Sequence, residues 1–386
     1  MANPAPQQKT ILVVDDTPIN LGVISGALKE SYKTKVATSG QKALAIASGE
    51  DKPDLILLDV MMPEMDGYEV CRRLKANSET KDIPVLFLTG QTGTEDETKG
   101  FEVGAVDYIH KPFSEAVVKA RVRTHLQLRE AHEQIARQLV AINIELEMAR
   151  QIQLSILPRD TPKLSGLDIV ARYMPMTSVA GDFYDFIVVD DKHVGVLIAD
   201  VSGHGLPSAL IASMLQVALS AQAAHASDPA RVLSGLNQAL CGKFEHNFVT
   251  AAYVYVDMEK KMMTYAGAGH PPLLFWRNSV GKVSEVVENG LFLGMFPEAT
   301  YTSLELPVAA SDRLILYTDG VPETKSPSDQ EFGTARFMKF MDSHQKLAVD
   351  QFADGLLDEL SRWSEQPRGQ GQQDDITVLT IDFKSI

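Results

Sequence analysis

ILVVDD, residues 11–16, sets two adjacent acids directly after four apolar residues. Four consecutive apolar side chains are typical of a strand that helices cover on both faces of a parallel sheet. The stretch LILLD, residues 55–59, repeats the arrangement and ends on Asp59. Because the carboxyl ends of parallel strands form the ligand crevice of such a sheet, Asp15, Asp16 and Asp59 are expected to lie close together.

Short apolar runs alternate with helical stretches over the first 120 residues or so. The other strand candidates are residues 35–38, 84–90 and 107–111, with helical stretches at 21–30, 41–47, 68–75, 96–105 and 114–122. Alternation of this kind predicts parallel pairing. We expect residues 1–120 to form an α/β doubly wound domain with a five-stranded parallel sheet.

The composition narrows the class of protein. A chain of 386 residues with 45% hydrophobic content is long enough for two domains. Its net charge of −15, without a Lys/Arg run, argues against a nucleic-acid partner. Cys71 and Cys241 are far apart, which fits a reducing compartment. The start of the chain lacks a signal-peptide pattern, and its most apolar stretch is broken by Pro207, so we expect a cytoplasmic protein without a membrane partner.

Residues 121–153 are predicted to form a long coiled-coil linker helix. Apolar residues recur at three-four spacing without Gly or Pro, and Arg121, His125 and His132 fall in the same register. The apolar members of this series are Val118, Leu128, Ile135, Leu139, Ile142, Leu146 and Ala149. A narrow stripe of this kind favours a homodimer, the alternative being a single helix packed on either domain.

Residues 154–386 change to short strands with a few helices. Strand candidates include 167–175, 181–189, 193–203, 248–257, 262–269, 314–320 and 375–381, with helices near 206–224 and 229–243. This order predicts an α+β sandwich of antiparallel sheets flanked by helices.

The N-terminal acids occur with further groups suited to phosphoryl chemistry. Three converging carboxylates fit Mg²⁺, which prefers oxygen ligands. Thr89 in LFLTG and Lys111 in IHKP follow two further strands and could contact a phosphoryl group on Asp59.

These motifs, together with LLDVMMPEMDG, resemble a response-regulator receiver domain in order and spacing. The resemblance implies that Asp59 is the phosphoacceptor and that Asp15, Asp16 and the Met61 carbonyl bind Mg²⁺ with it. It also implies that Thr89 and Lys111 contact the phosphoryl oxygens. Tyr108 stands where the family has an aromatic residue that changes rotamer with Thr89, and a cis Lys111–Pro112 peptide is expected.

A second group of acids lies beside apolar strands of the C-terminal domain. Its members are Asp182, Asp185, Asp200, Asp319, Asp374 and Asp375. Converging carboxylates without His or Cys at ligand spacing select Mg²⁺ or Mn²⁺ over Zn²⁺. Two such ions about 3.5–4 Å apart can activate one water for attack on phosphorus. Each acid alone could equally be a turn or helix-cap residue.

These segments, with ARQIQLSILP, AGAGHPPLL, GLFLGM and FGTARF, resemble the metal-dependent Ser/Thr phosphatases of type 2C, in their bacterial SpoIIE/RsbU branch. The resemblance implies two Mn²⁺ or Mg²⁺ ions. Asp200 would bridge them, and the Val201 carbonyl would bind one. Asp182, Asp319 and Asp374 would complete the set, and Asp185 and Asp375 would act as neighbours.

Two features depart from the eukaryotic members. Thr177 and Ser178 stand in the region of the phosphate-anchoring arginine, so phosphate recognition is unassigned. His204 is offset from the histidine proposed there as general acid, and a helix-start role is its alternative. His270 is expected to be structural.

The combined resemblance implies a two-component response regulator whose output is a protein Ser/Thr phosphatase gated by phosphorylation of Asp59. Its partners would be a separate cognate histidine kinase and, as substrate, a phosphorylated anti-sigma-factor antagonist. The alternative is a pseudo-phosphatase or scaffold that sequesters a phosphoprotein.

Overall fold

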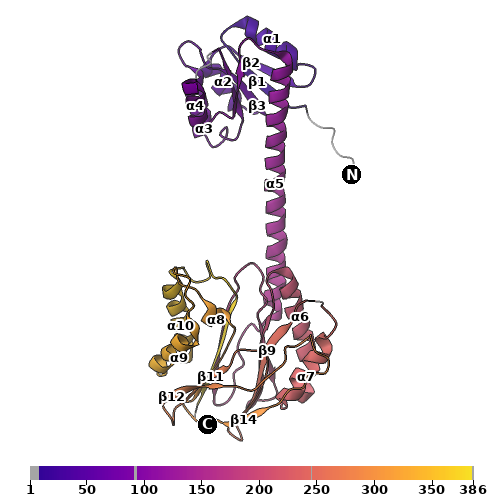
Figure 1. Ribbon diagram of the computed structural model, residues 1–386, viewed down its shortest axis with the longest axis vertical. Helices are drawn as coiled ribbons and strands as arrows, with labels where there is room; N and C mark the ends of the chain where they lie inside the picture. Colours follow the sequence, from indigo (N-terminus) through magenta and orange to yellow (C-terminus); the bar gives the residue numbers. More distant parts are fainter. Residues whose placement is uncertain (1–7, 91–93, 245, 385–386) are drawn as a thin grey trace. The chain divides into compact units, whose positions relative to one another are not determined.

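The computed structural model describes residues 8–90, 94–244 and 246–384 (Figure 1). The chain divides into two compact units, Met1–Ala141 and Ile142–Ile386, and each is described by itself. Within the described residues, no helix is both long and apolar enough to cross a membrane.

The first unit is the predicted doubly wound domain. Its five parallel strands lie in the order β2-β1-β3-β4-β5. The strands are β1 (Thr10–Val14), β2 (Lys33–Ala37), β3 (Leu55–Asp59), β4 (Val85–Thr89) and β5 (Asp107–His110). The helices are α1 (Pro18–Leu28), α2 (Gly40–Ala47), α3 (Gly67–Ala76), α4 (Thr94–Glu102) and the start of α5 (Glu115–Ile156). The predicted sheet and its parallel pairing are confirmed.

Buried side chains on both faces explain the continuous apolar runs. β1, β3 and β4 are buried along their whole length. Ile11 and Val13 pack with residues of α1 and α5, whereas Leu12 and Val14 pack with residues of α2 and α3. Alternate residues of one strand therefore pack into two separate hydrophobic clusters, one on each face of the sheet. Polar residues can follow only at the end of the strand, where both clusters stop.

The helix α5 runs without interruption through 42 residues, as predicted. Its first turns belong to the core of the first unit, because Val118, Val122 and Leu126 are buried against the sheet. Arg121 and His125 both contact the Asp107 carboxylate, at 2.6 Å and 2.9 Å. The prediction that Val118, Arg121 and His125 belong to a self-pairing stripe is therefore wrong, because these residues make contacts within the first unit.

Exposed apolar residues continue on α5 beyond Leu126. Leu128, Ile135, Leu139 and Ile142 are each 51–55% exposed. We call these four residues the α5 stripe. Their 7-4-3 spacing is the heptad spacing of a coiled coil, and the self-pairing of the helix stays a prediction.

The second unit is the predicted sandwich of two sheets. One sheet has the order β13-β10-β9-β8-β7, with β14 also paired to β10, and the other has the order β12-β11-β15-β16-β6. The first contains β7 (Phe183–Val188), β8 (His193–Val201), β9 (Val249–Asp257), β10 (Met262–Ala268), β13 (Asn289–Gly290) and β14 (Leu304–Pro307). The second contains β6 (Leu167–Met174), β11 (Leu273–Arg277), β12 (Lys282–Val286), β15 (Arg313–Tyr317) and β16 (Ile376–Phe383). All pairings are antiparallel except that of β10 with β13.

Helices cover the outer faces of both sheets (Figure 1). α6 (Leu206–Ser220) and α7 (Pro229–Leu240) pack on the first sheet, with the 3₁₀ turn η1 (Ala223–His225) between them. α9 (Gly333–His344) and α10 (Val349–Ser364) pack on the second, preceded by the short α8 (Gly320–Glu323). The sequence analysis did not predict α8, α9 or α10. In β15, Leu314 and Leu316 face the other sheet, whereas Ile315 and Tyr317 face α9 and α10.

Candidate active site

The first acid cluster lies at the carboxyl ends of β1 and β3. Carboxylate oxygens of Asp15, Asp16 and Asp59 lie within 4.8 Å of one another. Asp15 and Asp59 are buried, and Asp16 is exposed. This oxygen-only donor set, open to solvent on one side, fits Mg²⁺, which usually retains several waters.

Lys111 joins the two buried acids. Its Nζ lies 2.9 Å from Asp15 Oδ2 and 2.9 Å from Asp59 Oδ2. Burial raises the pKa of Asp59, and the hydrogen bond from Lys111 offsets part of that rise. Burial alone would lower the pKa of Lys111, but the bonds to the two acids outweigh it and the net shift is upward. The ammonium group therefore stays charged beside the phosphoacceptor candidate.

The other predicted receiver residues lie near the same end of the sheet. Thr89 is the buried last residue of β4, and its carbonyl accepts a 2.8 Å hydrogen bond from the Lys111 backbone N–H. The Met61 backbone N–H donates to Asp59. Tyr108 is buried, with its ring 5.1 Å from that of Phe101. The Lys111–Pro112 peptide is cis, which confirms the expectation.

The second acid cluster lies where two antiparallel strand pairs end. Asp182 precedes β7 and Asp200 lies near the end of the neighbouring β8. Asp319 follows β15, and Asp374 precedes the neighbouring β16 by two residues. Because antiparallel neighbours bring the end of one strand beside the start of the next, each pair of strands presents two acids at one place.

Glu323 joins this cluster, although the sequence analysis did not propose it. Carboxylate oxygens of Asp319, Glu323 and Asp374 lie within 4.8 Å of one another. Asp319 directly precedes α8, without a side-chain capping bond, and Glu323 ends the helix, so the two residues are four apart on one helical turn. That i,i+4 spacing in TDGVPE was the available signal, since such residues share a helix face.

Gly181 allows the backbone of the Asp182 loop to approach Asp200 and Val201. A Cβ built on Gly181 would lie 2.7 Å from the Val201 carbonyl oxygen and 3.4 Å from Asp200 Oδ1. Any side chain at this position would force the loop away. The Val201 carbonyl oxygen and an Asp200 carboxylate oxygen therefore both lie close to Gly181.

Two buried threonines orient Asp182. Thr318 Oγ1 donates to Asp182 Oδ2 at 2.8 Å, and Thr377 Oγ1 donates to the same oxygen at 2.5 Å. The Thr377 backbone N–H in turn donates to Thr318 Oγ1 at 2.9 Å. Neither threonine was predicted from the sequence, although each lies next to or near a proposed acid in YTDG and DDIT.

Asp375 holds backbone rather than joining the carboxylate cluster. Its carboxylate accepts hydrogen bonds of 2.7 Å from the backbone N–H groups of Met176 and Gly181. Asp185 accepts a 2.7 Å hydrogen bond from the Phe186 backbone N–H, and burial raises its pKa. The structure places Asp185 in β7, outside the group formed by Asp319, Glu323 and Asp374.

The end of α5 holds the same loop from the other side. Gln153 Nε2 donates to the Ala180 carbonyl at 2.7 Å, and its Oε1 accepts from the Ala180 N–H at 3.0 Å. Gln153 is buried, so both bonds are shielded from water. Residues 176–181 are therefore fixed between the Asp375 carboxylate and the Gln153 amide.

Burial and mutual repulsion raise the pKa values of these acids. The pKa of Asp200 is raised to about 8, first by burial and then by the charges of Asp319 and Asp374. The pKa of Asp319 is raised to about 6 by burial and by Asp374. That of Asp182 is raised well above its usual value by burial and by Asp200. A cluster of oxygen donors that is costly to ionise without a counter-charge fits one or more hard divalent cations.

Neither His204 nor His270 belongs to the group of carboxylates formed by Asp319, Glu323 and Asp374. His204 is exposed. Burial lowers the pKa of His270 to about 3, so its ring is neutral, and its Nδ1 lies 3.0 Å from Thr250 Oγ1. Thr250 is the cross-strand neighbour of Asp200, so His270 contacts the strand next to the one that carries Asp200.

Comparison with protein families identifies both parts of the chain. Residues 11–123 match the model of the response regulator receiver domain. Residues 190–384, half of the chain, match that of stage II sporulation protein E (SpoIIE). Asp182 precedes the second matched segment.

Individual relatives match one part or the other. Phosphoserine phosphatase RsbU of Bacillus subtilis is 27% identical over 244 residues, covering 63% of this chain and 71% of RsbU. A probable cyclic di-GMP phosphodiesterase of Vibrio cholerae is 52% identical over 120 residues, covering 31% of this chain. The chain spans about a quarter of that relative's length, namely 27%.

A solved structure supports the fold of the second unit. The SiaA-PP2C domain of Pseudomonas aeruginosa matches with a TM-score of 0.57 at 25% identity. The match covers 64% of this chain and 100% of that domain. The receiver-plus-phosphatase resemblance and the predicted sandwich are thereby confirmed.

The raised pKa of Asp200 leads to a stability prediction. With a folded-state pKa of about 8 against an ordinary 3.8, Asp200 costs the folded state stability as pH rises from about 4 to about 8. Asn cannot ionise, so Asp200→Asn should stabilise the metal-free unit by roughly 2–5 kcal/mol at pH 8 and by little near pH 4.

Both tryptophans, Trp276 and Trp363, lie in the second unit, so urea unfolding in a chelator, followed by tryptophan fluorescence, measures this unit in the full chain. Asp191→Asn changes an exposed acid of the same unit and serves as the control. Equal stability of wild type and Asp200→Asn at pH 8 would contradict the assigned repulsion.

Proposed function

The chain belongs to the SpoIIE family and carries a receiver domain before the family domain, and from this premise we propose that it is a metal-dependent protein serine/threonine phosphatase gated by phosphorylation of Asp59. One observation carries the proposal. Carboxylates from separate segments of the second unit converge at one end of the sandwich, and their pKa values are raised by burial and by one another. A binding module has no need of such a costly arrangement.

The metal ligands would be Asp182, Asp200, Asp319 and Asp374 together with the Val201 carbonyl. Glu323 is added to this set because its oxygen lies with those of Asp319 and Asp374. Two bound Mn²⁺ or Mg²⁺ ions would supply Lewis acidity toward the phosphoryl oxygens and an activated water. The chain's own contribution is to fix the geometry: Thr318 and Thr377 orient the Asp182 carboxylate before any ion binds.

The proposed substrate is a phosphoserine or phosphothreonine of a small anti-sigma-factor antagonist. Two relatives from Bacillus subtilis, RsbU and RsbP, are named phosphoserine phosphatases, and each is 27% identical to this chain. Resemblance to their branch supplies the antagonist as substrate.

The receiver unit would accept its phosphoryl group from a separate histidine kinase. Asp59 is the acceptor, and Asp15 and Asp16 would hold Mg²⁺ with it. Lys111 Nζ already lies 2.9 Å from an Asp59 oxygen, where it would neutralise charge on the phosphoryl oxygens. Thr89 and Tyr108 would respond to the phosphorylated state.

Coupling between Asp59 and the second acid cluster is proposed to run through α5. The helix begins in the receiver core, and its last turn carries Gln153, whose amide clamps Ala180 beside Gly181 and Asp182. A homodimer formed through the α5 stripe would make the position of this helix sensitive to receiver pairing. Phosphorylation can act only if the two states differ in how well they hold the Asp182 loop.

Hydrolysis of p-nitrophenyl phosphate in Mn²⁺ tests the activity and its gating. Asp200→Ala should lower kcat/KM at least about 100-fold, since even partners of metal ligands commonly cost 10- to 100-fold. Beryllofluoride should change the wild-type rate and leave Asp59→Ala unchanged.

Asp191→Ala is the matched acidic control and should behave as wild type. A chain that hydrolyses nothing under any condition yet binds a phosphoprotein would support the sequestering scaffold instead.

Charge placed in the α5 stripe should separate the subunits. Leu139→Asp combined with Ile142→Asp should lower the molar mass measured by light scattering and remove the response to beryllofluoride, because two pairs of carboxylates would face one another. The control, Val140→Asp with Ile144→Asp, makes the same change at exposed positions of the helix outside the stripe. Equal effects of both double variants, or none from the first, would contradict the stripe as interface.

Gln153→Leu should loosen the Asp182 loop without removing a proposed metal ligand. The Mn²⁺ concentration for half-maximal activity should rise about 10-fold, with activity restored at saturating Mn²⁺, as for partners that orient metal ligands. The response to beryllofluoride should be lost. Gln151→Leu, two residues earlier and exposed, should leave both quantities unchanged. Wild-type Mn²⁺ dependence in Gln153→Leu would exclude the clamp from the coupling path.

A further inference from the structure

Residues 269–272 carry the chain of the second unit from one sheet to the other. They follow β10 of the first sheet and precede β11 of the second. Gly269 has a φ of +67°, and a Cβ built on it would lie 2.1 Å from the Phe292 ring, so a side chain there would collide with that ring. Two prolines follow His270, and each has a fixed φ angle. The crossover therefore has little conformational freedom around His270.

The side chain of His270 is buried and has a neighbour on each sheet. On the first sheet, its Nδ1 lies 3.0 Å from Thr250 Oγ1 in β9, and Asn289 Nδ2 in β13 donates to its carbonyl at 3.0 Å. Burial lowers the pKa of His270 to about 3, and the backbone of Tyr317 in β15, on the second sheet, acts in the opposite direction. A backbone carbonyl has that effect because it favours a ring N–H. The imidazole therefore connects β9 of the first sheet with β15 of the second.

Both neighbours of the imidazole lie beside proposed metal ligands. Thr250 is directly opposite Asp200 in the β8–β9 ladder, so the two side chains share a face of the sheet, with Cβ atoms roughly 4.5–5.5 Å apart. Tyr317 ends β15, two residues before Asp319. Because the imidazole is neutral, it acts on these acids through their positions rather than through its charge.

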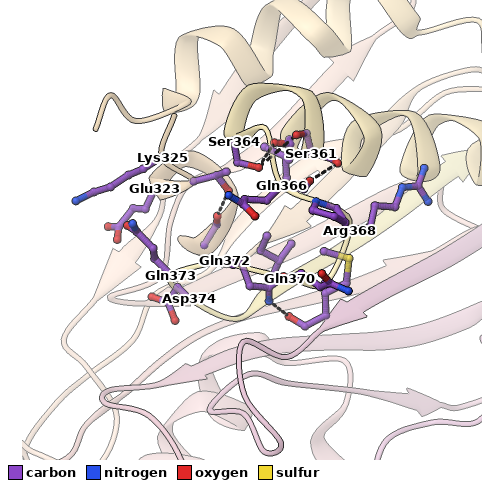
Figure 2. A pocket seen from close by; sticks show the side chains of 18 of the residues that line it. Glu323, Lys325, Ser361, Ser364, Gln366, Arg368, Gln370, Gln372, Gln373 and Asp374 are labelled. Carbon is purple, nitrogen blue, oxygen red and sulfur yellow. Dashed lines mark hydrogen bonds between the residues drawn. The ribbon is translucent and has the colours of Figure 1, made fainter. Parts of the chain in front are cut away.

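The separation of the two sheets decides how close the acids of the second cluster come. Asp200 lies on the first sheet, and the charges that act on it include those of Asp319 and Asp374, which flank strands of the second. Repulsion between them pushes these ends of the sheets apart. On the solvent side the acids face open space, since Glu323 and Asp374 line a polar cleft of about 520 Å³ (Figure 2). The spacing must therefore be held from the buried side, where His270 contacts both sheets.

A histidine that only filled space would be a costly choice at this position. Its Nε2 is buried and has no hydrogen-bond partner among the described residues. A buried polar atom without a partner destabilises the folded state, and an apolar side chain of similar size would avoid that cost. The contact with the Thr250 hydroxyl is what an apolar side chain could not supply.

We propose that His270 is a positioning residue: it sets the separation of the two sheets at the second acid cluster, and with it the geometry in which Asp200 and Asp319 bind divalent cations. The assignment rests on the metal-dependent phosphatase function proposed above. Thr250 is the partner of His270 in this role, because it fixes the ring on β9, which pairs with the strand that carries Asp200.

Binding of Mn²⁺, measured from the electron paramagnetic resonance signal of the free ion, tests this role without relying on catalysis. Every full-length variant also carries Asp15→Asn, so that the first acid cluster does not contribute. Thr250→Val removes the hydroxyl that contacts His270, and His270→Phe removes both ring nitrogens. Each should raise the Kd for Mn²⁺ about 10-fold, as for other partners that orient metal ligands. Hydrolysis of p-nitrophenyl phosphate should recover at saturating Mn²⁺.

Two further variants separate positioning from packing. Thr250→Ser keeps a hydroxyl and should restore wild-type binding of Mn²⁺. Thr380→Val removes a buried threonine hydroxyl that has no hydrogen-bond partner among the described residues, so binding should not change. Tryptophan fluorescence in urea checks that each variant folds, and Thr250→Val decides alone if His270→Phe does not. Wild-type affinity in Thr250→Val, or equal weakening in Thr250→Val, Thr250→Ser and Thr380→Val, would overturn the proposal.

Failure of the phosphatase function gives a different result. A chain that binds Mn²⁺ in the second unit but hydrolyses no phosphate ester would contradict the proposed function, and weaker binding in Thr250→Val would still support the positioning role of His270. A second acid cluster that binds no Mn²⁺ would overturn the positioning role, whatever the activity.

Discussion

Repulsion among carboxylates is the constraint on which the second unit depends. Asp200 is held where burial and the charges of Asp319 and Asp374 raise its pKa to about 8. Sheet pairing causes this, because β7 and β8, like β15 and β16, bring their acid-bearing ends together. The unfavourable energy is localised at one end of the sandwich, while the apolar residues between the sheets supply the stability that tolerates it. A divalent cation would convert the same repulsion into binding energy.

The loop of residues 176–181, which precedes Asp182, connects the acid cluster to the rest of the unit through hydrogen bonds to its backbone. Two different side chains hold its backbone: Asp375, directly before β16, through the N–H groups of Met176 and Gly181, and Gln153 from α5, through Ala180. Neither is in the group of converging carboxylates. A loop fixed at several backbone atoms can place the Asp182 carboxylate to within a fraction of an ångström, which metal ligation demands. One of the two holding side chains, Gln153, belongs to α5, whose first turns lie in the core of the first unit.

The sequence predicted those features that come from local chemistry. Apolar runs such as Ile11–Val14 identified buried parallel strands, and acids at their ends identified both clusters. What it missed depends on contacts between distant segments. The first turns of α5 carry the same three-four pattern whether they pair with a copy or pack on their own sheet. The burial of Val118, Val122 and Leu126, together with the contacts of Arg121 and His125 to Asp107, shows that they pack on the sheet. The role of Gln153 likewise could not be predicted from the sequence, because it depends on hydrogen bonds to Ala180, which is 27 residues away. The helix α10 could have been predicted from the sequence, because its buried residues Phe352, Leu356 and Leu360 recur at helical spacing.

The two acid clusters solve one electrostatic problem in different ways. In the receiver, Lys111 supplies a permanent positive charge 2.9 Å from two carboxylates, so the site is partly neutralised before it binds an ion. In the second unit, the largest charge effects on Asp200 come from other acids, and the hydroxyls of Thr318 and Thr377 hold Asp182. Hydroxyls orient a carboxylate without cancelling its charge. The first site therefore keeps a positive charge beside Asp59, whereas the acids of the second site stay costly to ionise until a cation compensates their charge. That difference fits one unit that receives a signal and another that performs hydrolysis.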